Sequence, residues 1–109
     1  MTVETLLQNL PWKAVSVTDP GREITGGYAG DLLSWVMGRA ESGDCWLTIM
    51  SNINVVAVAQ LTDVACVVFT EGVMPDESVM AAAKQHDINL IACDEPTFAA
   101  GSKVAELLR

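Results

Sequence analysis

Basic residues are scarce in this chain. Six Lys and Arg stand against fourteen Asp and Glu, which gives a formal net charge of −8 over 109 residues. Nucleic-acid binding needs a basic surface that displaces counterions from phosphates, and attraction to anionic membranes needs positive charge as well. The charge balance therefore predicts no nucleic-acid partner and no membrane partner, and acidity itself indicates solubility.

Long hydrophobic runs are also missing. Half of the residues are hydrophobic, but they come in short stretches, none close to the ~20 residues of a membrane-spanning helix. The first residues, Met1-Thr2-Val3-Glu4, carry no basic region of a secretory signal. Length and composition together predict a single folded domain over residues 1–109, located in the cytoplasm.

Cysteines are few and widely spaced. Cys45, Cys66 and Cys93 each lie in or beside an expected strand, and no C-x-x-C pair accompanies the single histidine, His86. A zinc site would need such close pairs. We predict reduced thiols in the core, and a solvated His86 near the end of a helix.

Catalytic motifs are lacking. Gly101-Ser102-Lys103 has no upstream glycine of a phosphate loop, Gly26-Gly27 with Gly30 does not make G-x-G-x-x-G, and no G-x-S-x-G occurs. Adjacent acids such as Asp76-Glu77 are better explained as stabilising helix starts. The sequence therefore predicts a protein that is not an enzyme and has no cofactor.

What is present is an alternation of apolar runs and helical patterns, which predicts an α/β fold. Helices are expected at 3–10, 31–41, 54–62, 77–86 and 97–108, and strands at 13–17, 23–26, 45–50, 65–70 and 88–93. Thr2 and Asp76 are expected N-caps, and Asp94 or Thr97 caps the last helix. The predicted architecture has three layers, with a mainly parallel sheet flanked by helices and right-handed crossovers.

One stretch, Ile24 to Met37, reads as a short strand, a glycine-rich turn and an amphipathic helix capped by Asp31. The inward stripe of that helix is predicted to be Leu32, Leu33, Val36, Met37 and Ala40, and that of the last helix Phe98, Gly101, Ala105 and Leu108. Trp35 lies off its stripe. It is therefore expected to form a homodimer contact or to pack beneath a neighbouring loop.

Ligands of open parallel sheets bind beyond the carboxyl ends of the strands, where loops lead into helix starts. The loops at 51–54, 70–72 and 93–97 fall there, and the 26–31 turn is expected to join them. The predicted ligand-binding residues are Gly26, Gly27, Asp31, Asn52, Asn54, Thr70 and Gly72. The alternative reading is that these residues serve only as helix caps and turns.

Several segments resemble a DRTGG domain over about residues 13–108. The segments that carry the resemblance are Thr25-Gly26-Gly27-Tyr28, Asp31 to Met37, Glu41 to Ile49, Asn54 to Ala59, Phe69-Thr70-x-Gly72, Pro75-Asp76-Glu77 and Thr97-Phe98. The resemblance implies a fold similar to the N-terminal domain of HPr kinase/phosphorylase, which lacks that kinase's catalytic phosphate loop. DRTGG domains also occur in phosphate acetyltransferases and in nucleotide-controlled pyrophosphatases.

Two functional hypotheses follow from the resemblance. The first is a non-catalytic regulatory domain that senses a nucleotide or other small anion at the strand ends. The second is an accessory module that forms a homo-oligomer, expected to be a homodimer, or docks on a partner enzyme.

Overall fold

The computed structural model describes residues 1–109 and contains one five-stranded sheet with the order β1-β5-β4-β3-β2. β2 to β5 are mutually parallel, whereas β1 runs antiparallel to β5. The strands are β1 Lys13–Ser16, β2 Gly26–Ala29, β3 Asp44–Thr48, β4 Cys66–Phe69 and β5 Leu90–Ala92. The helices are α1 Val3–Asn9, α2 Leu33–Arg39, α3 Asn54–Thr62, α4 Glu77–Gln85 and α5 Thr97–Leu107.

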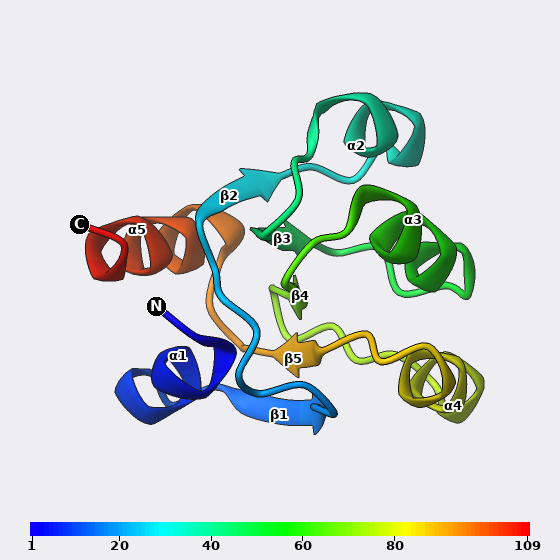
Figure 1. The fold of residues 1–109 in the computed structure, drawn as a ribbon, viewed down its shortest axis with the longest axis horizontal. Helices are drawn as coiled ribbons and strands as arrows, with labels where there is room; N and C mark the ends of the chain where they lie inside the picture. The colour runs from blue at the N-terminus through cyan, green and yellow to red at the C-terminus, as the bar shows by residue number, and fades with distance from the viewer.

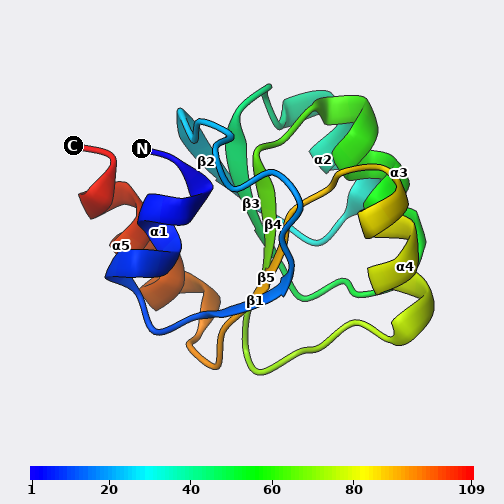
Figure 2. The same cartoon turned by 60° about the horizontal axis from the view of Figure 1, so that its bottom comes forward.

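The elements form three layers. α1 and α5 cover one face of the sheet, and α2, α3 and α4 cover the other (Figure 1). Turning the molecule shows the same separation, with the two chain ends close together beside α1 and α5 (Figure 2). This arrangement confirms the predicted three-layer α/β fold with a mainly parallel sheet. No helix has the length and apolar character needed to cross a membrane.

α3 and α4 were predicted correctly for different reasons. The β-branched run in α3 favours a strand by propensity, but Val55, Val56 and Val58 are buried against the sheet in the crossover between β3 and β4. In α4, Asp76 caps the helix by accepting a hydrogen bond from the Val79 amide at 3.1 Å. His86 follows α4 and is exposed, as predicted.

The glycine-rich turn was wrongly predicted, because Gly26 to Ala29 form strand β2 rather than the approach to a helix. Gly26 is aligned with Asp44 and Ala29 with Leu47 in the parallel pairing with β3. A Cβ atom at Gly26 would lie 2.7 Å from Oδ1 of the buried Asp44 carboxylate. The glycine there makes room for a neighbouring side chain and does not make a turn.

The inward stripes of α2 and α5 were also partly wrong. Val36 is buried, but Leu32 and Met37 are 57% and 51% exposed. In α5 the buried residues are Ala100 and Val104, whereas Phe98 is 90% exposed. Both helices carry apolar residues around most of their circumference, so the pattern alone did not identify the buried side.

β1 and β2 are consecutive in the chain but lie at opposite edges of the sheet. The segment 17–25 joins them across the amino ends of the other strands and is visible in front of the sheet in Figure 1. Buried Asn89 holds it by accepting from the Asp19 amide at 3.0 Å and donating to the Asp19 carbonyl at 2.8 Å. Arg22 adds an ion pair to Asp63 at 2.9 Å. We refer to residues 17–25 as the strap.

The centre of the sheet is fully buried on both faces. Val67 and Val68 in β4 have no exposed surface and belong to the two opposite core clusters. Trp46 in β3 is also fully buried, and its indole N–H donates to the Gly30 carbonyl at 2.9 Å. The sheet therefore separates two apolar layers, as a parallel sheet with helices on both sides requires.

All three cysteines are free and buried, and Cys45 lies opposite Cys66 in the pairing of β3 with β4. A hydrogen bond with the Cys66 thiol, together with burial, raises the pKa of Cys45. Burial likewise raises the pKa of Cys93. Because the thiolate is the reactive form of cysteine, the raised pKa values lower the reactivity of Cys45 and Cys93 in the folded state.

We therefore expect the three thiols to react with a thiol reagent only after unfolding. A Leu61→Cys variant supplies the control, because Leu61 is 71% exposed on α3. In native buffer this variant should incorporate one equivalent quickly and the wild type almost none. Rapid labelling of all three native cysteines without denaturant would contradict the buried assignment.

Candidate functional site

The carboxyl ends of β2, β3, β4 and β5 meet at one edge of the sheet, because these strands are parallel. Five of the seven predicted site residues lie in the segments that follow these ends: Asp31, Asn52, Asn54, Thr70 and Gly72. Gly26 and Gly27 begin β2 and lie at the opposite end of that strand. The expectation that both glycines join the other residues at one edge is therefore wrong. We call the carboxyl-end side the carboxyl edge.

Asp31 organises the turns after β2 and β3. Its Oδ1 accepts hydrogen bonds from the Thr48 hydroxyl and the Ile49 amide, both at 2.8 Å. The Met50 amide in turn donates to the Thr48 hydroxyl at 3.1 Å. Helix α2 begins two residues later, with no side-chain cap bond. The predicted capping role of Asp31 is therefore wrong, and its carboxylate instead joins two neighbouring strand ends.

Thr70 and Gly72 lie together at the end of β4. The Thr70 hydroxyl shares a hydrogen bond of 2.6 Å with the Thr97 hydroxyl. The Gly72 amide donates to the Cys93 carbonyl at 3.1 Å, and Gly72 has φ +77°, which favours glycine. These contacts tie the end of β4 to the loop after β5.

The start of α5 is stabilised from outside its own segment. The Thr97 amide donates to Oε2 of Glu71 at 3.0 Å, and the helix has no cap bond from its preceding residue. The prediction that Asp94 or Thr97 caps α5 is therefore wrong. A carboxylate at a helix start interacts favourably with the helix dipole. Glu71 thus occupies, with its own negative charge, a position that could otherwise attract an anion.

Asn52 and Asn54 precede and begin α3, and both are exposed. The Asn52 Oδ1 atom accepts from the Asn54 amide at 2.9 Å, which forms a local turn. This bond fixes the side chain of Asn52, whereas the side-chain amide of Asn54 makes no hydrogen bond within the chain. The polar groups at this corner therefore include one exposed side chain at a helix start.

Sequence reasoning missed Lys13. Because β1 runs antiparallel to β5, its first residue is aligned with Ala92 and so lies at the carboxyl edge. Lys13 lines a small cavity of about 100 Å³ together with Gly72, Asp94 and the end of β5. The apolar alternation of 13–17 correctly indicated a strand, but it carried no information about direction. Lys13 brings a positive charge to an edge whose loops carry the exposed carboxylates of Asp31, Glu71 and Asp94.

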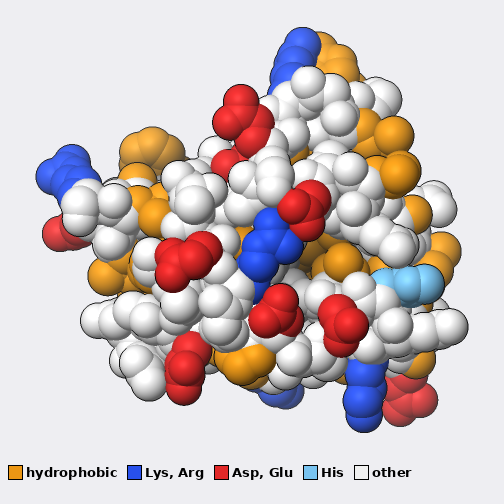
Figure 3. Space-filling model, viewed as in Figure 1, with side chains coloured by type: hydrophobic (Ala, Val, Ile, Leu, Met, Phe, Trp, Pro, Cys, Tyr) orange, Lys and Arg blue, Asp and Glu red, His pale blue; other side chains and the backbone are white.

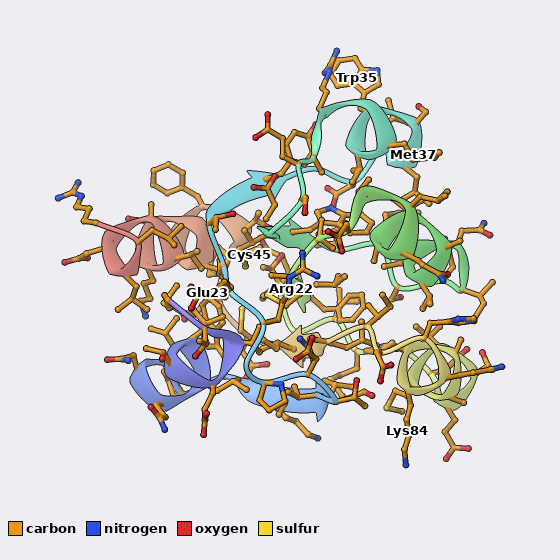
Figure 4. The ribbon with its side chains drawn as sticks, in the orientation of Figure 1. Arg22, Glu23, Trp35, Met37, Cys45 and Lys84 are labelled. Carbon is orange, nitrogen blue, oxygen red and sulfur yellow. The ribbon has the colours of Figure 1, made fainter.

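The opposite edge also has a hollow, of about 230 Å³, lined by Arg22, Asp63, His86 and Asn89 among others. Figure 3 shows carboxylates spread around one basic side chain on this side of the molecule, and Figure 4 identifies that position as Arg22. The hydrogen bond to Asp63 and the negative charge of that carboxylate raise the pKa of Arg22. Hydrogen bonds from Arg22 and Ser42, with the positive charge of Arg22, lower the pKa of Asp63. Since Arg22 is already paired, this hollow offers less to an anion than the carboxyl edge does. No group of three or more His, Cys, Asp or Glu side chains is arranged to hold a metal ion.

Comparison with known proteins gives a similarity in fold. No protein-family model and no curated protein sequence matches the chain. Among solved structures, the chain is similar to the CBS and DRTGG domains of the regulatory region of Clostridium perfringens pyrophosphatase, complexed with its activator diadenosine tetraphosphate. The TM-score is 0.72 at 17% sequence identity, over 93% of this chain and 44% of that chain. The chain thus spans less than half of the structure it matches, and it has a DRTGG-like α/β fold.

Proposed function

We propose that this protein is a non-catalytic regulatory domain that binds a nucleotide or another small anion. The observation that carries the proposal is the similarity in fold to a regulatory region whose solved structure contains the activator diadenosine tetraphosphate. The absence of catalytic motifs in the sequence agrees with a sensing role. A cytoplasmic location remains part of the proposal.

The ligand would bind at the carboxyl edge. The exposed Asn54 side chain would contact phosphate or ring atoms, and Lys13 would supply positive charge. Asp31 would hold the two strand ends in place. Gly26 and Gly27 are left out of this site because they lie at the opposite end of β2.

The edge also limits how tightly a polyphosphate can bind. Asp31, Glu71 and Asp94 are exposed carboxylates on the loops that form it. Like charges repel the phosphates, so we expect weak binding or a Mg²⁺ ion shared between phosphate and carboxylate oxygens.

Titration with AMP, ADP, ATP and diadenosine tetraphosphate, each with and without Mg²⁺, tests the proposal. Amide NMR shifts are expected in the loops at 51–54, 70–72 and 93–95, with smaller shifts in Lys13→Gln. Lys84→Gln is the matched control, because Lys84 points away from the body on α4 (Figure 4). An absence of shifts at millimolar ligand would reject nucleotide sensing.

A second candidate function is assembly, as a homodimer or as an accessory module of a partner enzyme. The supporting observation is the presence of large exposed apolar side chains on two helices, with Trp35 53% and Phe98 90% exposed. Trp35 projects outward from α2 (Figure 4), so the expected packing beneath a loop is wrong, and the Arg39 guanidinium stacks 3.6 Å from the ring centroid. Light scattering on the wild type and on Trp35→Ala would measure whether α2 contributes to assembly.

A further inference from the structure

On one face of the sheet, α5 packs against the edge strand β2 but leaves part of that strand exposed. Three helices lie along one side of the sheet, but only α1 and α5 lie along the other (Figure 1). On that second side Gly27 and Ala29 of β2 are exposed, whereas Tyr28, which points to the three-helix side, is half-buried. An apolar groove of about 230 Å³ runs between β2 and α5, with Gly27, Ala29, Gly101 and Ala105 among its walls.

Phe98 stands beside this groove. Its side chain is 90% exposed on the first turn of α5, and it borders a shallow surface shared with Ala29, Gly101 and Ala105. A phenylalanine that is 90% exposed next to an apolar groove gains little burial within the chain. Contiguous apolar surface of this kind marks an interaction site.

Gly101 leaves the outer surface of α5 open to the close approach of another helix. Glycine inside a helix costs roughly 0.5–1 kcal/mol relative to alanine. A Cβ atom at Gly101 would meet nothing within 4 Å, so packing inside the chain does not require the glycine. The glycine permits another backbone to approach closely on the outside of α5.

Charge indicates which partner fits. Each copy carries a net charge of −8, so two copies repel except through a face without carboxylates. No charged residue lines either the groove or the surface around Phe98. An acidic chain can therefore meet a second copy of itself at this face without burying like charges.

The face is also self-complementary. Phe98, Gly101, Ser102 and Ala105 follow one another at helical spacing on the exposed side of α5. If two α5 helices cross antiparallel about a two-fold axis between Gly101 and Ser102, Phe98 of each copy lies opposite Ala105 of the other. Each ring then reaches the mouth of the other copy's groove. A two-fold contact uses the same patch on both copies, as this arrangement does.

We propose that a second copy of this chain docks on the β2–α5 groove, with α5 packed against α5 and Phe98 seated in the groove of the other copy. The inference rests on the proposed homodimer and names its surface as α5 rather than the Trp35 face of α2. It is independent of nucleotide binding at the carboxyl edge.

Sedimentation of wild type, Gly101→Leu and Gly38→Leu tests the proposal. Each glycine lies in a helix at a position where an added Cβ atom would meet open space, so neither change should unfold the chain. Wild type and Gly38→Leu are expected to be dimers. Gly101→Leu should weaken the dimer by about tenfold or more, without lowering the melting temperature of the monomer. Phe98→Ser should weaken it similarly.

A crosslink tests the geometry separately. The three native thiols are buried, so Ser102→Cys adds the one reactive thiol and places it beside the two-fold axis. Mild oxidation should give a covalent dimer, and adding Phe98→Ser should reduce its yield.

A wild type that stays monomeric at a millimolar protein concentration would overturn both the homodimer and this surface. A dimer that survives Gly101→Leu and Phe98→Ser but is lost in Trp35→Ala would overturn this surface alone. Neither result would bear on the nucleotide titration.

Discussion

Val68→Asp is expected to lower the free energy of unfolding by about 4 kcal/mol or more, which is a large part of the ~5–15 kcal/mol that holds a typical domain folded. Val68 is fully buried in β4 and flanked by β3 and β5. A carboxylate at that position would lose its hydration and find no positive partner. Denaturant unfolding followed by circular dichroism would measure the loss.

Leu61→Asp is the matched control for this change. Leu61 is 71% exposed on α3, so the same introduced charge remains in water. Because an acid in the last turn of α3 opposes the helix dipole, we expect its free energy of unfolding to fall by no more than about 1.5 kcal/mol. Cooperative wild-type-like unfolding of Val68→Asp would reject the central, doubly covered position of β4.

Trp46→Ala is expected to cost about 3–5 kcal/mol, because it removes a fully buried ring and leaves a cavity. It also leaves the Gly30 carbonyl without its 2.9 Å hydrogen bond from the indole. That bond links β3 to the turn after β2, so the loss should extend to the end of β2. Chemical denaturation measures the total, and amide exchange at Gly30 reports the local effect.

Trp35→Ala provides the comparison within the same residue type. Trp35 is 53% exposed and contacts the Arg39 guanidinium. Removing it should change the free energy of unfolding of the monomer by no more than about 1 kcal/mol. Similar losses for the two tryptophans would contradict the burial that separates them.

The parallel core could be predicted because its signals are local. β3, β4 and β5 are short apolar runs, and each segment between them has the length of a helical crossover between parallel strands. Asp76 was identified as a cap because the bond to Val79 spans three residues. Each of these predictions depends on neighbours in the sequence.

The rest depends on contacts between distant segments. Glu71 stabilises the start of α5 across 26 positions of the chain, and no local pattern identifies such a cap. Lys13 reaches the carboxyl edge only because β1 runs antiparallel to β5. Gly26 lacks a side chain because the Asp44 carboxylate on the neighbouring strand occupies that space. That contact is not visible in the local sequence, so the glycines were interpreted as a turn.

The order of the strands has a consequence for synthesis on the ribosome. β1 emerges first but pairs only with β5, the last strand of the chain. The strap likewise depends on Asn89, directly before β5. Until those residues are translated, β1 has no strand to pair with. The apolar side chains of the nascent α1 and β1 therefore stay accessible to chaperones. Folding of this domain is therefore completed late, when β5 pairs with β1.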